Sequence, residues 1–165
     1  MGFVAGSILS VKNVLARPWL SQMDSATDQW YRMCFSTSSA MFCEYLKANC
    51  LKNHPERRNG EQIDDFYLRL LNATFGDSTD AQAQLAMHRY LGVNSRFRQN
   101  GTRETLEWFL SRGLPVMAGQ LHHGSYHRPD ASKSHWNLCV GWAPENDSFV
   151  FHDPAGSMDT TGGGY

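Results

Sequence analysis

The apolar pattern of the chain changes its period near Gly113, and this change restricts the possible folds more than any other feature. Before Gly113, apolar residues recur at helical spacing, as at Ile63, Phe66 and Leu70. After it, "LPVMAGQL", "WNLCVGW" and "SFVFHD" alternate or are continuously apolar, which is typical of strands. Helices followed by strands predict an α+β domain, with N-terminal helices packed on a C-terminal antiparallel sheet.

Four helical segments are expected before the strands. The first runs from about residue 34 to residue 51, and Thr102 is positioned to cap the last. A glycine follows each of the last three patterns: Gly76, Gly92 and Gly113. The alternating segment "VNSRFRQ" from Val93 predicts a short strand, and "APEND" predicts a turn between the last two strands.

The length of 165 residues suits one domain with a substantial core. We expect an N-terminal arm over residues 1–14, the folded domain over 15–158 and a flexible tail over 159–165. The formal net charge of −1 lacks the basic footprint of a nucleic-acid-binding protein. A monomer that takes no cofactor is the expectation.

Membrane insertion and export are not predicted. No stretch approaches the roughly 20 apolar residues that cross a bilayer. The N-terminal "MGFVAGSIL" is short and has no basic region before it, unlike a secretory signal. The chain is therefore expected to be cytoplasmic on synthesis.

Only one of the cysteines has surroundings that suggest chemistry. The four are Cys34, Cys43, Cys50 and Cys139. No C-x-x-C pair occurs, so no structural zinc site is predicted. Cys43, Cys50 and Cys139 lie among apolar residues and are interpreted as small buried hydrophobic groups with reduced thiols.

Cys34 opens the segment "CFSTSSAM" at the expected start of a helix. The thiolate is the attacking form of cysteine, and the free N–H groups at a helix start favour an anion. The small hydroxyl residues that follow prefer first turns to helix interiors. The alternative is a buried cysteine at a helix start, and this segment alone does not decide between the two.

His135 and Asp153 are the candidate base and orienting acid for Cys34. His135 begins the strand "HWNLCVGW", and Asp153 follows the strand "SFVF". Neighbouring antiparallel strands would bring the carboxylate beside the imidazole, fixing its tautomer and stabilising its protonated form. The alternatives are a histidine at a sheet edge and an Asp that opens a turn before Pro154.

A tetrahedral intermediate of acyl transfer needs hydrogen-bond donors for its oxyanion. The backbone N–H of Cys34 is one candidate, and the side chain of Gln22 or Gln29 is another. Gln22 is favoured because "WLSQMD" changes from apolar to polar there, which would fix its position, whereas Gln29 lies in the more irregular "TDQWYR".

The loop "HHGSYHRPD" offers a competing zinc site. Its possible ligands are His122, His123, His127 and Asp130. Gly124 and Pro129 argue against a helix that would hold two of these histidines on one face, and a flexible loop is a poor preformed site. No metal is predicted, and the loop is expected to flank the cleft beside His135.

Five segments together resemble the bacteriocin-processing-like branch of the papain-like cysteine peptidases. They read "SQMD", "CFSTSSAM", "GLPV", "SHWNLCVGW" and "HDPAG", in the family's order from about Arg17 to Gly156. The resemblance implies a papain-like fold with Cys34 as nucleophile, His135 as base, Asp153 as orienting acid and Gln22 at the oxyanion.

Two positions depart from the family pattern: Phe35 and Ser134 stand where the family has Gly. Phe35 would narrow the cleft. The long spacing from Gln22 to Cys34 resembles members from phages and bacterial envelopes, some of which cut peptidoglycan cross-links.

The leading hypothesis is therefore a cysteine peptidase that cleaves peptidoglycan stem peptides as a phage lysin, acting at the cell wall after release. An intracellular or leader-peptide protease of the same fold is the first alternative. The second, from another class, is a binding or structural module that has lost the chemistry, and Phe35 is its main support.

Overall fold

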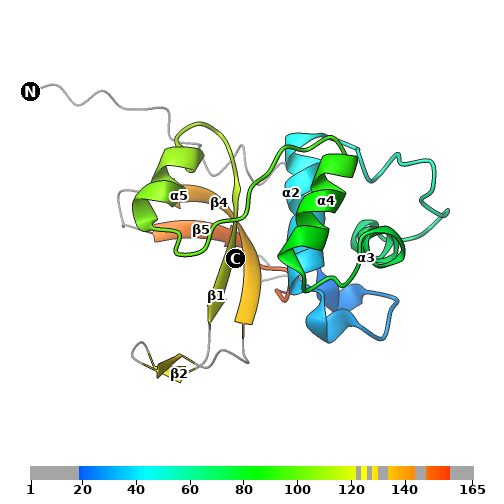
Figure 1. Ribbon diagram of the computed structural model, residues 1–165, viewed down its shortest axis with the longest axis horizontal. Helices are drawn as coiled ribbons and strands as arrows, with labels where there is room; N and C mark the ends of the chain where they lie inside the picture. The colour runs from blue at the N-terminus through cyan, green and yellow to red at the C-terminus, as the bar shows by residue number, and fades with distance from the viewer. Residues whose placement is uncertain (1–18, 122–123, 126–127, 130–133, 144–147, 157–165) are drawn as a thin grey trace, which may run out of the picture.

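The structure is a computed structural model, and it describes residues 19–121, 124–125, 128–129, 134–143 and 148–156. Short 3₁₀ turns η1 (Gln22–Asp24) and η2 (Trp30–Arg32) precede the helices. The helices that follow are α2 (Cys34–Leu46), α3 (Ile63–Thr74), α4 (Ala81–Tyr90) and α5 (Arg103–Leu110). Figure 1 shows that α2, α3 and α4 form a group beside the strands.

The strands follow the helices in the chain, as the apolar pattern predicts. The three longest are β1 (Val116–Leu121), β4 (Ser134–Ala143) and β5 (Ser148–His152). They form one antiparallel sheet in the order β1-β4-β5, in which Gln120 pairs with His135 and Leu138 pairs with His152. The two-residue strands β2 (Gly124–Ser125) and β3 (Arg128–Pro129) pair separately. The predicted α+β class is confirmed.

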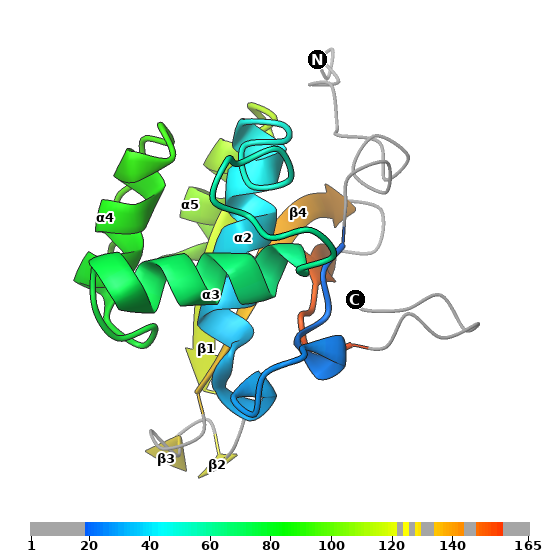
Figure 2. The same ribbon diagram turned by 90° about the vertical axis from the view of Figure 1, so that its right-hand side faces the viewer.

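Helix α2 is the central element of the core. Figure 2 shows α3 crossing one side of α2, while β1 and β4 lie on its other side. Its residues Phe35 to Glu44 are all buried. Met41 packs in one cluster with Leu138 and Val140 of β4, and with Phe66 of α3. Burying each of these side chains contributes about 1.5–3 kcal/mol, so helix and sheet are held together by apolar burial.

The expected ends of the later helices are confirmed. Gly76, Gly92 and Gly113 all have positive φ values, of 122°, 78° and 73°, as residues that follow helix C-termini often do. At the other end of α5, the Thr102 side chain accepts a hydrogen bond from the Thr105 N–H.

The first predicted helix is too long, because α2 ends at Leu46 rather than near residue 51. The buried carboxylate of Glu44 stabilises the turn that follows α2. It accepts hydrogen bonds from the backbone N–H groups of Asn49 (2.8 Å), Leu51 (2.6 Å) and Lys52 (3.0 Å). Asn49 adopts a φ of 63°, which is incompatible with continuing the helix.

The predicted strand at "VNSRFRQ" is wrong, since residues 93–99 contain no strand. Val93 is buried and its N–H donates to the His88 carbonyl at the end of α4, so the segment begins as a helix-terminating turn. Most of the residues after it are exposed. Of the predicted "APEND" turn at 143–147, only Ala143 is described, and it ends β4. The rest of this turn, the arm at 1–14 and the tail at 159–165 lie outside the described residues.

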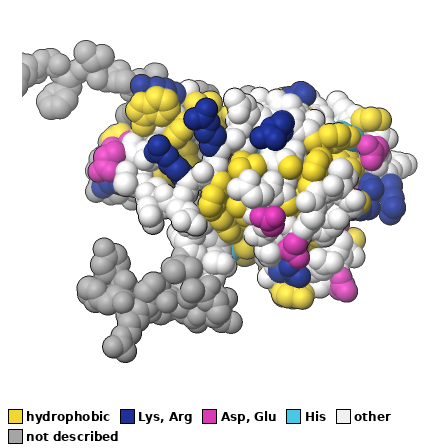
Figure 3. Space-filling model, in the orientation of Figure 1, with side chains coloured by type: hydrophobic (Ala, Val, Ile, Leu, Met, Phe, Trp, Pro, Cys, Tyr) yellow, Lys and Arg dark blue, Asp and Glu magenta, His cyan; other side chains and the backbone are white. Residues whose placement is uncertain are grey.

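Figure 3 shows exposed basic and hydrophobic side chains gathered over α5. The Arg112 guanidinium lies 3.9 Å from the ring centroid of Trp108, which is 51% exposed. Within the part of the chain that the structure describes, none of the helices has the length and apolar character needed to span a bilayer.

Replacing Glu44 by Ala is expected to destabilise the fold by about 3 kcal/mol, because three backbone N–H groups lose a charged acceptor. Urea unfolding followed by circular dichroism measures the change. The control is Glu107→Ala, which removes the exposed i,i+4 pair with Arg103 and should cost less than about 0.5 kcal/mol. Equal effects of the two substitutions would contradict this role of Glu44.

Candidate active site

Cys34 is the first residue of α2 and is partly exposed. The buried residues that follow it fix this end of the helix against the sheet. Helical hydrogen bonding is established at once, since the Thr37 N–H donates to the Met33 carbonyl at 2.8 Å. The first N–H groups of a helix have no partner within the helix, so the sulfur lies where an anion is favoured.

His135 and Asp153 form a hydrogen-bonded pair. The distance from His135 Nε2 to Asp153 Oδ1 is 2.7 Å. His135 is the second residue of β4, and Asp153 directly follows β5. These strands are antiparallel neighbours, so the start of one lies beside the end of the other.

The Cys34 sulfur belongs to the same cluster. The pKa of His135 is raised to about 9, first by its hydrogen bond with Asp153 and then by a hydrogen bond with Cys34. Burial opposes these effects because it disfavours the imidazolium. Since Nε2 faces Asp153, Nδ1 is the ring nitrogen left to exchange a proton with the sulfur. The structure thus brings together Cys34, His135 and Asp153.

The loop that carries Asp153 is held by residues 19–22, which lead into η1. The Trp19 Nε1–H donates to the Asp153 carbonyl at 3.0 Å, and the Gln22 N–H donates to the Pro154 carbonyl at 2.8 Å. Within the loop, the Ala155 N–H donates to Asp153 Oδ1 at 2.8 Å. The Asp153 carboxylate is therefore hydrogen-bonded both to an N–H group of its own loop and to His135, and these two bonds fix its orientation.

Gln22 is buried beside this loop, and its side chain is hydrogen-bonded to the turn that precedes Cys34. Its side chain is 5% exposed, and its Nε2 donates to the Trp30 carbonyl at 2.9 Å, in the turn that leads into α2. An amide nitrogen has two protons, so a second donor remains for an incoming oxygen. Gln29 is partly exposed, and its carbonyl accepts the Arg32 N–H within η2.

The comparison with protein families identifies a family for this chain. The model of the Peptidase_C39 like family matches residues 14–163. The chain belongs to this family. No significant match is found among the curated proteins or among the solved structures. Family membership supports a peptidase that acts on peptide substrates, and the α+β fold is consistent with a papain-like peptidase.

Asn137 is a buried polar residue of the site that the sequence interpretation missed. In the amide orientation that satisfies its neighbours, its Nδ2 lies 3.3 Å from Asp153 Oδ1 and 2.9 Å from His135 Nε2. Its Oδ1 then accepts from Gln120 Nε2 at 3.0 Å. Side chains two positions apart on a strand share a face, so its spacing from His135 was the available signal.

The other thiols lie in environments that keep them protonated. Burial raises the pKa of Cys139 to about 12 and raises that of Cys43 well above its usual value. Both are buried, as the sequence predicts, whereas Cys50 is only partly buried. Burial still raises the pKa of Cys50 to about 11, so its thiolate is scarce at neutral pH.

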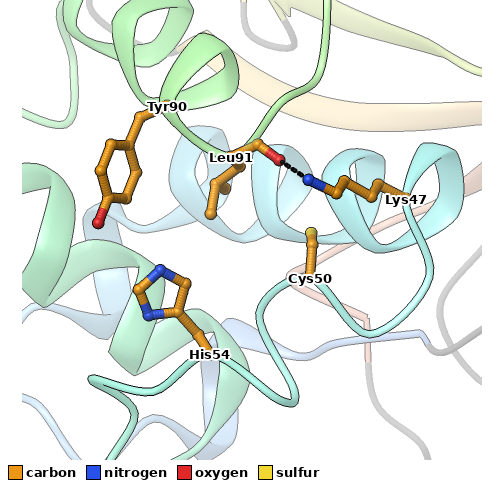
Figure 4. A pocket seen from close by; sticks show the side chains of 5 residues that line it. All are labelled: Lys47, Cys50, His54, Tyr90 and Leu91. Carbon is orange, nitrogen blue, oxygen red and sulfur yellow. Dashed lines mark hydrogen bonds between the residues drawn. The ribbon is translucent and has the colours of Figure 1, made fainter.

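Cys50 lines a cavity of about 320 Å³ with four other side chains: Lys47, His54, Tyr90 and Leu91. Figure 4 shows the Lys47 ammonium pointing to the Leu91 carbonyl, 2.9 Å away. Lys47 follows the last residue of α2, which places this cavity about 20 Å along the helix axis from Cys34. It is separate from the candidate active site.

The four residues considered for a zinc site, His122, His123, His127 and Asp130, all lie outside the described residues. Among the described residues, no three His, Cys, Asp or Glu side chains gather into a group that would hold a metal ion.

Replacing Asp153 by Asn is expected to lower the pKa of His135 from about 9, because the largest cause of the upward shift is removed. NMR titration of the ring measures the change. His88, whose burial lowers its pKa to about 4, is the internal control and should titrate unchanged. An unaltered His135 titration would contradict the assigned pairing.

The same substitution should change how stability depends on pH. A pKa raised above the unfolded value of about 6.5 stabilises the folded protein fully below that pH, and this contribution is lost as pH rises through the folded value. The stability advantage of the wild type over Asp153→Asn should therefore shrink between pH 6.5 and about 9. Urea unfolding across this range provides the measurement.

Proposed function

We propose that the protein is a cysteine peptidase that hydrolyses amide bonds through an acyl-enzyme. The observation that carries the proposal is the convergence of a partly exposed sulfur at a helix start with a hydrogen-bonded imidazole and carboxylate. These are a nucleophile, its base and the group that orients the base.

In this mechanism, the Cys34 thiolate attacks the carbonyl carbon of the scissile amide and a tetrahedral oxyanion forms. His135, protonated beside the thiolate, gives its proton to the leaving amine, and the C–N bond breaks to leave a thioester. Water then attacks the thioester while His135 takes up its proton, which releases the acid and regenerates the thiol–imidazole pair. Asp153 keeps the His135 ring in place throughout and stabilises it when it is protonated.

Gln22 is the proposed side-chain donor to the oxyanion, together with the backbone N–H of Cys34. Two observations support this role of Gln22. It is buried beside the loop that carries Asp153, and its side chain is hydrogen-bonded to the turn that precedes α2. Donors fixed before the reaction stabilise developing charge without reorganising. Among the described residues, Gln29 has no hydrogen bond to the loop that carries Asp153.

The substrate we propose is the stem peptide of peptidoglycan, cut by a phage-type lysin that acts at the cell wall after release. Its support is the resemblance of the Gln22-to-Cys34 spacing to members from phages and bacterial envelopes. An intracellular or leader-peptide protease is the alternative within the same chemistry. The inactive-module alternative rested on Phe35, whose ring is buried rather than exposed in the cleft.

Cys34→Ala is expected to abolish hydrolysis while leaving the circular dichroism spectrum unchanged, because the nucleophile is removed from a partly exposed position. Cys50→Ala is the matched control and should keep its activity. Zymography on purified peptidoglycan and release of amines from peptide pools give the two readouts. Full activity of Cys34→Ala would refute the mechanism, and cleavage of peptides without clearing of peptidoglycan would refute the lysin role alone.

Gln22→Ala is expected to lower kcat by about 10²–10³, the usual effect of losing one oxyanion donor. KM should change little, because the donor acts on charge that develops during the reaction. Gln29→Ala is the paired control and should retain kcat. A larger loss in Gln29→Ala than in Gln22→Ala would reverse the assignment.

A further inference from the structure

Phe35 and Trp136, which directly follow Cys34 and His135 in the chain, stack on each other. Their ring centroids are 4.0 Å apart and the planes differ by 4°. Phe35 is 7% exposed, so its ring lies between the helix and the sheet. Each ring belongs to the neighbour of a proposed reacting residue, and the contact therefore joins the two backbone segments that carry the sulfur and the imidazole.

Strand β1 confines the Trp136 ring. Gly119 is the cross-strand partner of Trp136. A Cβ atom at position 119 would lie only 2.7 Å from Trp136 Cζ2 and 2.8 Å from Cε2. The indole thus lies against the β1 backbone in space that only glycine leaves open.

A hydrogen bond connects the helix and the strand at the same place. The Ser38 hydroxyl, one turn after Phe35 and fully buried, donates to the Trp136 carbonyl at 3.0 Å. The ring stack and this hydrogen bond are two separate contacts between the start of α2 and the start of β4. Two contacts limit both sliding and rotation of the helix end relative to the strand.

We propose that Phe35 is a positioning residue which, by stacking on Trp136 over Gly119, sets the separation of the Cys34 sulfur from the His135 ring. This inference rests on the proposed function of Cys34 and His135. The family segment that this chain resembles has glycine at the position of Phe35, so the stack is a feature of this chain rather than a requirement of the general pattern. Small displacements of reacting groups have large effects on rate.

The test compares three variants of the full chain: Phe35→Leu, Phe35→Tyr and Phe42→Leu. Leucine keeps an apolar side chain but removes the stack, whereas tyrosine restores an aromatic ring. Phe42 is the matched control because it lies on the same helix, is 9% exposed and contacts His88 rather than the site. It is about 10 Å further along the helix axis.

Alkylation of Cys34 by iodoacetamide at neutral pH, located by peptide mass mapping, reports the reactivity of the sulfur. NMR titration of His135 reports its contact with the sulfur, since Cys34 is the second cause of the raised pKa. Phe35→Leu should react roughly 10-fold to 100-fold more slowly and should show a lower His135 pKa. Phe35→Tyr and Phe42→Leu should match the wild type in both measurements.

Three results would overturn the positioning role: a wild-type rate and titration in Phe35→Leu, an equal loss in Phe42→Leu, or no recovery in Phe35→Tyr. A further measurement distinguishes failure of the positioning role from failure of the proposed function. If wild-type Cys34 reacts no faster than the same cysteine in urea-denatured protein, the nucleophile assignment fails, and the positioning role fails with it.

Discussion

The hydrogen bond between His135 and Asp153 is the contact on which the arrangement of the site depends. It forms because β4 and β5 are antiparallel neighbours, so that the first residues of one strand lie beside the residue after the other. The pair then meets the sulfur because α2 packs its buried face on β4 with its N-terminus at the same end of the strand. The sheet order and the direction of one helix are therefore enough to assemble groups that are about a hundred residues apart in the sequence.

Much of the fold was predictable because helix ends and strand periods are local properties. Glycines after helices and the change of apolar period gave the right class and the right order of elements. The predicted strand after Val93 failed because alternation is also local, whereas a strand needs a neighbour to bond with. The end of α2 was misplaced for a similar reason. Glu44 accepts hydrogen bonds from three N–H groups later in the chain, and no residue spacing in the sequence predicts these bonds.

The residues of the candidate site also divide into those that local sequence features predict and those that depend on contacts across the fold. The chemical types of Cys34, His135 and Asp153, together with their places at the ends of predicted elements, were sufficient to propose them. The choice between Gln22 and Gln29 remained open because it depends on the hydrogen bonds between the segment before α2, which has no regular pattern, and the loop that carries Asp153. Asn137 was missed because a polar residue within an apolar strand has no assigned role until its neighbours across the sheet are known.

The link between residues 19–22 and 153–156 has a wider consequence. Besides the bonds to Asp153 and Pro154, the Ser21 hydroxyl donates to the Gly156 carbonyl at 3.2 Å. The earliest and the latest described segments are thus hydrogen-bonded to each other beside Asp153. A substitution within residues 19–22 can therefore disturb the orientation of the Asp153 carboxylate, although the two segments lie at opposite ends of the described sequence.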